Sequence, residues 1–438
     1  MTNLKRILLM SASVFAFTNV VIAEEAKKPE QVPVVSDLAV KLSGFAHFQS
    51  AYRNQNKLEK DEKNVSANKK NFAFYSQAAL VANISNQVDE ITYGGRIVLV
   101  PTTKAKGGTS YNGSHIYLES EFGKVEAGSP SLPSQTMSIG AGDITAASLT
   151  DFSSYAKFDT DYLTQRGVSP TFATSTDFFL DSALNTTLDS KKYSSEPSRS
   201  VVYYTPKFDL GSSTKIQVGI SYTPDSSNTG ADKASTKGSG VTEKIIDHGG
   251  VYKFKMDRSV TDAFTGGICI EQNFSDGVDL KVALTGEYGK SAGSAQKFAA
   301  KDDTDPTKTF KLSDLKAYSV GAVLNVGNIS YAGSYGSLGN SLTTPELHKT
   351  GRKTEYYTGA VAYKQGPFTA SAGYFKSFQF KNTVDAVSLG TSYKLAPGFK
   401  PYASITGYTA KGAPVCFPDL DKKTTRGTVF VLGAKMSL

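Results

Sequence analysis

Short runs in which apolar and polar residues alternate follow one another along most of this 438-residue chain. In the run 38–52, Val40 and Phe48 fall on one face of an extended strand, and Lys41 and Gln49 fall on the other. A period of two is typical of a β-strand with one apolar face. Comparable runs lie at 72–84, 91–100, 115–120, 121–128, 200–206, 215–224, 264–273, 278–289, 315–326, 329–337, 355–364, 368–378, 383–395, 399–408 and 426–438.

The connections between these runs are alternately short and long. Tight turns such as Gly327-Asn328 alternate with polar loops, which lie at 224–242, 289–312, 337–351 and 409–425. Strands of about ten residues joined in this way are typical of an outer-membrane barrel. A soluble β-sandwich also alternates, but it has no reason to segregate long and short connections. We therefore expect an all-β, transmembrane antiparallel β-barrel.

The number of predicted strands is 16, with one segment left over. Residues 245–256 (IIDHGGVYKFKM) also alternate and would make 17 strands. A single-chain bacterial barrel has an even number of strands. The segment is therefore either part of the loop before 264–273 or one of two extra strands in an 18-stranded barrel. We take 16.

Residues 129–198 interrupt the pattern, because they show no sustained alternation. A stretch of this length is functional or disordered rather than an ordinary connection. Its first half interleaves aromatic residues with acids, which are Asp143, Asp151, Asp159 and Asp161. An acidic, aromatic insertion in an all-β repeat suggests a long loop folded into the lumen. The part from about Gly167, rich in Ser and Thr, is expected to stay outside.

Residues 1–23 have the features of a signal peptide. Lys5 and Arg6 precede an apolar run, and Val21-Ile22-Ala23 ends in the small-residue pattern of a cleavage site. No later segment approaches the roughly 18–20 consecutive apolar residues of a transmembrane helix. We expect an exported chain with an N-terminal lead at 24–37 and the barrel at 38–438.

Composition agrees with this interpretation. The chain has 23 Tyr, 25 Phe, 39 Gly and no Trp, and its two cysteines are too few for a disulfide framework. The formal net charge is +8, but the bases are evenly spread, which argues against a nucleic-acid partner. Tyrosines at strand ends suit the aromatic girdles of a membrane barrel. These are Tyr93, Tyr222, Tyr288, Tyr335, Tyr374 and Tyr408.

Basic residues on the polar face of the predicted strands are candidates for the pore wall. They are Arg96, Lys41, Lys215, Lys281 and Lys435. A base is tolerated in a wet lumen, whereas on the lipid face at mid-bilayer it costs roughly 2–4 kcal/mol. Arg96 is the first choice, because its apolar neighbours Tyr93 and Ile97 fix its phase.

Ordered features over nearly the whole chain resemble the general bacterial porin family. They are the signal peptide, the first strand VKLSGFAHFQSAY, FGKVEAGSP before the long stretch, SVVYYTP after it, and a C-terminal strand that reaches the last residue. The resemblance implies a 16-stranded barrel in the cell outer membrane, a homotrimer, and a third loop folded inward as the constriction. The loop acids would face the wall bases across the pore, and opposed charges of this kind sort solutes by charge.

The resemblance also implies a function, which is a water-filled channel for passive diffusion of small hydrophilic solutes and ions. The partners would be outer-membrane lipid and lipopolysaccharide, and no cofactor is implied. Structural calcium stays open at Asp159/Asp161 or Asp302-Asp303-Asp305, although neither has the spacing of a recognised calcium loop.

Three other functions stay open: a substrate-specific porin for sugars, phosphate or peptides, a surface adhesin or antigen barrel, and an outer-membrane enzyme. The enzyme is the weakest, because the histidines lie on scattered segments and none has zinc spacing. Ser114 and His115 are adjacent, but neighbouring residues of a strand point to opposite faces. We therefore expect no enzymatic activity.

Overall fold

The computed structural model describes most of the chain between Leu38 and Ser437. The described residues are 38–56, 71–100, 110–156, 198–211, 213–226, 241–247, 250–256, 259–298, 308–343, 353–379, 382–412 and 423–437. The predicted signal peptide and lead lie outside them, so both stay predictions.

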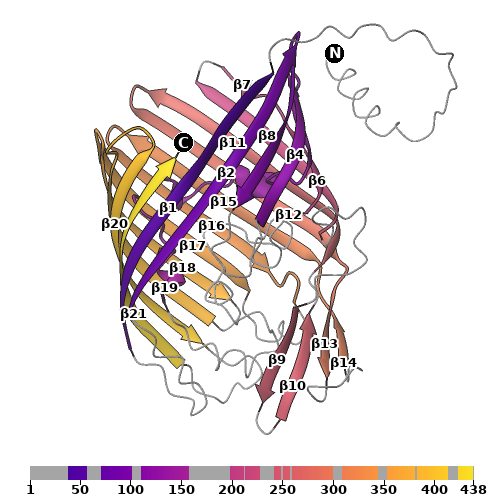
Figure 1. Cartoon of the computed structure of the whole chain (residues 1–438), viewed down its shortest axis with the longest axis vertical. Coiled ribbons are helices and arrows are strands. Elements are labelled where there is room, and N and C mark those ends of the chain that lie inside the picture. Colours follow the sequence, from indigo (N-terminus) through magenta and orange to yellow (C-terminus); the bar gives the residue numbers. More distant parts are fainter. Residues whose placement is uncertain are drawn as a thin grey trace, which may run out of the picture. The chain divides into compact units, whose positions relative to one another are not determined.

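One antiparallel sheet closes on itself to form a barrel (Figure 1). Within the described residues its strands are β1 (Ala39–Gln55), β2 (Phe72–Val88), β3 (Ile91–Val100), β4 (Ser110–Ser120), β5 (Gly123–Gly128), β6 (Ser200–Tyr204), β7 (Phe208–Asp209), β8 (Thr214–Asp225), β11 (Val260–Ser275), β12 (Val278–Ser291), β15 (Leu315–Val326), β16 (Ile329–Gly339), β17 (Thr354–Gln365), β18 (Phe368–Gln379), β19 (Asn382–Tyr393), β20 (Phe399–Gly412) and β21 (Lys423–Ser437). Closure occurs where β1 pairs with both β2 and β21. The short strands β6 and β7 both pair with β8 and follow one another along it, so they share one position in the wall. The barrel is therefore 16-stranded, as predicted.

The two faces of the wall differ as the alternation predicted. Along β8, Ile220 and Tyr222 are exposed, whereas Ser221 and Thr223 between them are buried. The exposed apolar face is the outer face of a barrel whose surroundings are lipid. The opposite face, which carries most of the polar residues, lines the interior.

The short connections lie together at one end of the barrel, and this short-turn end also holds the start of β1 and the end of β21. Gly327 and Gly366 occupy two of these turns with φ values of 57° and 55°, where glycine is the least strained residue. In bacterial outer-membrane barrels the short turns face the periplasm. The other end carries the longer connections, although only residues 380–381 separate β18 from β19.

The segment 245–256 lies outside the barrel sheet. Its described residues fall within β9 (Val241–Asp247) and β10 (Gly250–Met256), which pair with each other. With β13 (Ser294–Phe298) and β14 (Lys308–Lys311) they form a separate four-stranded sheet in the order β14-β13-β10-β9. The 18-stranded alternative is therefore wrong. The segment belongs to the connection before β11, as the other alternative held, and finds its partner in the connection after β12.

Five of the predicted girdle tyrosines lie on the outer face. They are Tyr93, Tyr222, Tyr288, Tyr335 and Tyr374. The prediction for Tyr408 was wrong, because this residue is buried and its ring stacks on Phe152 at 5.0 Å between centroids. Tyr408 shares the phase of the buried Tyr402 and Thr406 on β20, so it faces the interior.

Candidate functional site: the lining of the barrel

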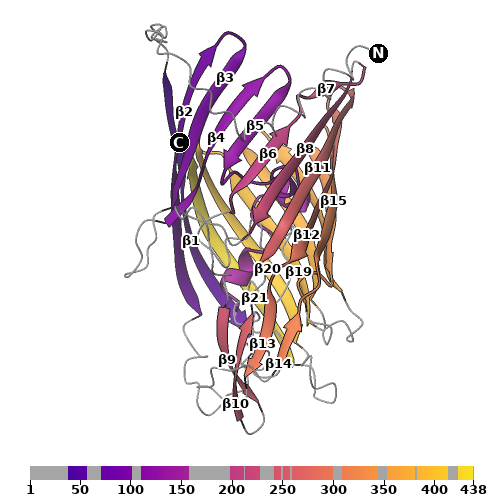
Figure 2. The same ribbon diagram turned by 90° about the vertical axis from the view of Figure 1, so that its right-hand side faces the viewer.

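Residues 129–156 leave β5 and run along the inner face of the wall. This segment carries the short helices α2 (Pro133–Thr136), η2 (Ala141–Asp143) and η3 (Asp151–Ser154), which Figure 2 shows within the ring of strands. Its buried side chains pack with inward residues of β17, β18, β20 and β21. No helix among the described residues is long and apolar enough to cross a membrane.

Glycines on the wall leave the space that this segment occupies. A Cβ atom added to Gly219 or Gly267 would lie 2.8 or 2.9 Å from the sulfur of Met137, closer than real Cβ contacts. A Cβ atom on Gly321 would overlap the carbonyl oxygen of Ile139. These glycines lie on β8, β11 and β15, so the segment approaches the wall strand after strand, through the Met137 side chain at β8 and β11 and through its backbone at β15. The abundance of glycine is evident from the sequence, but the path of the segment along these glycines is not.

An aromatic contact anchors the far end of the segment to the wall. Phe152 is completely buried and stacks on Tyr408 of β20. The guanidinium of Arg53 on β1 donates a hydrogen bond to the carbonyl of Tyr155 at 2.8 Å. Aromatic pairs of this kind contribute about 0.5–1.5 kcal/mol beyond the area they bury. The segment is therefore fixed at η3 as well as at α2.

Gln49 of β1 is the centre of a buried polar network at the same place. Its amide oxygen accepts a hydrogen bond from the Tyr155 hydroxyl at 2.6 Å. Its amide nitrogen donates to Asp151 Oδ2 at 3.1 Å and to the Tyr402 hydroxyl at 2.5 Å. Burial, with a further contribution from the Asp151 charge, raises the pKa of Tyr155. Its hydroxyl therefore stays protonated and remains a donor to Gln49.

The predicted loop acids have different surroundings. Asp143 is exposed, and its Oδ2 accepts a hydrogen bond from the Gly140 backbone N–H at 2.7 Å, which closes the turn at η2. Asp151 is half-buried in the Gln49 network. Asp159 and Asp161 lie outside the described residues, as does Asp302-Asp303-Asp305. The structure thus places two of the four acids on the inward segment.

A cavity of about 700 Å³ lies between the start of this segment and the wall formed by β3, β4, β5 and β8. Arg96, the first choice among the wall bases, lines it together with His115. Lys124 and Glu126 form an ion pair of 2.7 Å in the same wall, and Lys124 also lies over the ring of Tyr117. Charged and polar side chains therefore line an open space inside the barrel.

The other predicted wall bases lie closer to the short-turn end. Glu271 of β11 forms ion pairs with Lys207 at 2.9 Å and Lys281 at 3.4 Å, and Lys215 is its direct partner across β8 and β11. Lys435 lies over the ring of Tyr402. Lys41 is exposed near the start of β1. Among the residues that the structure describes, none of the five predicted bases forms an ion pair with Asp143 or Asp151.

Sequence reasoning missed several residues of this lining. Gln49 and Arg53 hold the segment, and Glu126 and Glu271 pair with wall lysines. All four lie on inward positions of predicted strands or one residue beyond them, so strand phase was the signal that could have found them.

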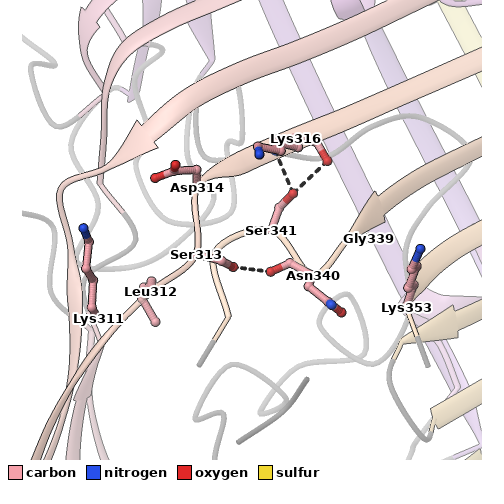
Figure 3. A pocket seen from close by; sticks show the side chains of 9 residues that line it. All are labelled: Lys311, Leu312, Ser313, Asp314, Lys316, Gly339, Asn340, Ser341 and Lys353. Carbon is pink, nitrogen blue, oxygen red and sulfur yellow. Dashed lines mark hydrogen bonds between the residues drawn. The ribbon is translucent and has the colours of Figure 1, made fainter. Parts of the chain in front are cut away.

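A second cavity, of about 520 Å³, lies at the end with the longer connections (Figure 3). The Ser341 hydroxyl donates to the carbonyl of Lys316 and accepts from its backbone N–H, both at 2.8 Å. The Ser313 hydroxyl donates to the carbonyl of Asn340. These bonds join the start of β15 and the connection before it to the residues that follow β16. The cavity contains none of the predicted site residues.

Comparisons with known proteins agree with this architecture. The sequence profile of a family described as Gram-negative porins matches residues 10–346. An uncharacterized protein of Rickettsia felis is 42% identical over 98% of this chain and 99% of its own length, and one of Rickettsia prowazekii is 41% identical over the same shares. Among solved structures, an anion-selective porin from Comamonas acidovorans has a TM-score of 0.50 at 12% identity, covering 92% of this chain and all of that one. A porin mutant from Rh. blastica has a TM-score of 0.48 at 14% identity, covering 91% of this chain and all of that one. The protein belongs to the Gram-negative porin family.

Proposed function

We propose that this protein is a general porin, a water-filled channel through which small hydrophilic solutes and ions diffuse passively across the outer membrane. The observation that carries the proposal is the inward segment 129–156, which lies against the wall and leaves a cavity of about 700 Å³ beside it. Charged side chains line that cavity, and such groups are tolerated in a barrel only where its interior is wet.

The inward segment supplies the constriction in this proposal. Acids on the loop side and bases on the wall create a transverse field that sorts solutes by charge. Asp143 is exposed on η2, and Arg96 lines the cavity on the wall side. Net charge of the whole chain does not decide selectivity, because the local field at the constriction governs it.

Membership of the porin family supports an expectation about assembly and location. We expect a homotrimer in the outer membrane, exported with the signal peptide 1–23, with its apolar outer face against lipid, lipopolysaccharide and neighbouring copies. The exposed apolar face of the wall supports this expectation, since it has no other partner among the described residues.

Neutralising the loop acids is expected to move the channel toward anion preference. The variant replaces Asp143, Asp151, Asp159 and Asp161 by Asn. Removal of negative charge from the constriction lowers the local concentration of cations, so the reversal potential in a salt gradient shifts toward the anion equilibrium potential. The measurement is planar-bilayer conductance of the purified protein.

The matched control is Asp262→Asn, which removes a carboxylate paired with Lys290 on the outer face. It should leave the reversal potential unchanged. An unchanged reversal potential in the fourfold variant would mean that these acids do not line the pore.

A further inference from the structure

Two lysines face each other across β20 and β21 at the short-turn end of the barrel. Lys400 and Lys435 are direct partners in the register of these strands. Lys400 shares the phase of the buried Tyr402 and Ser404, and Lys435 shares that of the buried Val431. Those phases face the interior, so both lysines line the mouth of the lumen.

Within the described part of the chain, neither lysine forms an ion pair with an acid. Among the described residues, no carboxylate forms an ion pair with Lys400 or Lys435, and the charge of Lys435 acts on both Lys400 and His47. His47 is the partner of Lys435 on the other side, across β1 and β21. Like charges placed directly opposite each other destabilise a sheet. A ligand that brings negative charge to this row would relieve the repulsion.

The geometry of the row fits a small oxyanion with several charges. Directly opposite residues of an antiparallel pair have Cβ atoms about 4.5–5.5 Å apart, so two lysine ammonium groups can reach different oxygens of one ligand. The ring of Tyr402 lies beneath Lys435, whose Nζ is 5.6 Å from the ring centroid. The Tyr402 hydroxyl is already engaged by Gln49 and His47. The two lysines therefore supply positive charge for the ligand, and the Tyr402 ring packs beneath the Lys435 ammonium group.

Charges elsewhere near the short-turn end are mixed. Lys207 and Lys281 form ion pairs with Glu271, and Lys215 is the direct partner of Glu271 on one side and of Asp209 on the other. Each of these three bases therefore has a carboxylate beside it, whereas no described carboxylate forms an ion pair with Lys400 or Lys435.

We propose that Lys400 and Lys435 form a binding site for small polyvalent oxyanions, such as phosphorylated solutes, at the short-turn mouth of the pore. The site rests on the proposed channel function and adds a substrate class to it. An anion that occupies it obstructs the mouth, so binding is measurable as a block of current.

The test uses inorganic tripolyphosphate as the probe on single channels of the full-length mature protein in 0.1 M KCl. Added to one side of the bilayer at a time, tripolyphosphate is expected to block at a concentration at least tenfold lower from one side than from the other. The Lys400→Gln, Lys435→Gln double variant is expected to raise that blocking concentration about tenfold. The Lys400→Arg, Lys435→Arg variant keeps both charges and should keep the block.

The matched control is Lys316→Gln, which removes an exposed lysine whose phase on β15 differs from that of the buried inward residues. It should leave the block unchanged. Normal conductance with an equal block in the wild type and the double Gln variant would overturn the site while leaving the channel function intact. A protein that forms no channels would overturn both.

Discussion

Replacing Phe152 by alanine is expected to release the end of the inward segment, increasing single-channel conductance and current noise. Phe152 of η3 is completely buried, and its ring stacks on that of Tyr408. It belongs to the apolar cluster that joins the segment to the wall. Truncating a buried Phe to Ala typically costs about 3–5 kcal/mol. Three hydrogen bonds also join this end to β1, and each contributes about 0.5–1.5 kcal/mol net. The substitution therefore removes about as much as these three bonds supply together, so the end of the segment is expected to loosen.

The measurement is single-channel conductance in planar bilayers, with urea unfolding of the folded barrel as a second readout. Phe122→Ala is the matched control, because Phe122 lies in the β4–β5 turn and 58% of it is exposed. This control should change neither readout appreciably. Wild-type conductance and noise in the Phe152→Ala variant would show that the aromatic anchor does not hold the segment.

The Gly321→Ala substitution is expected to have the opposite effect on conductance. The added methyl group would overlap the carbonyl oxygen of Ile139, and that oxygen belongs to backbone rather than to a flexible side chain. Overpacking of this kind typically costs about 1–3 kcal/mol. Because the wall is fixed by its pairing to both neighbouring strands, the segment is expected to move away from it into the lumen. Conductance should fall.

Gly359→Ala provides the matched control, since nothing lies within 4 Å of a Cβ atom at that position on β17. It adds the same methyl group to a neighbouring part of the wall and should leave conductance unchanged. A Gly321→Ala channel that conducts as well as the wild type would contradict the close approach of segment and wall.

Strand phase accounts for most of what the sequence predicted correctly. A period of two assigns each residue of a strand to one face, so Lys41, Gln49 and Arg96 could be placed on the polar face before their neighbours were known. The same rule separated the apolar outer face of β8 from its buried Ser221 and Thr223. The same rule assigns Tyr408 to the inner face together with Thr406, although its place near a strand end suggested the aromatic girdle.

Contacts between distant segments could not be predicted in this way. Besides its neighbour β9, β10 pairs with β13, which lies about 40 residues further along and within a stretch that resembled a polar loop. The close approach of Ile139 to Gly321 depends on the path of a segment that has no repeating pattern. Gln49 is neutral, and only the fold brings Asp151 and Tyr155 to it. Strand phase places a residue on a face but does not say what covers it.

A barrel that encloses a water-filled pore lets small hydrophilic solutes cross the membrane, and liposome swelling measures that passage. Purified protein is incorporated into liposomes, which are then diluted into isotonic solutions of sugars of increasing size. We expect swelling whose rate falls steadily as the sugar becomes larger, because a wet channel with a constriction excludes solutes by size. Folded, incorporated protein that gives no size-dependent swelling would mean that the barrel encloses no such pore.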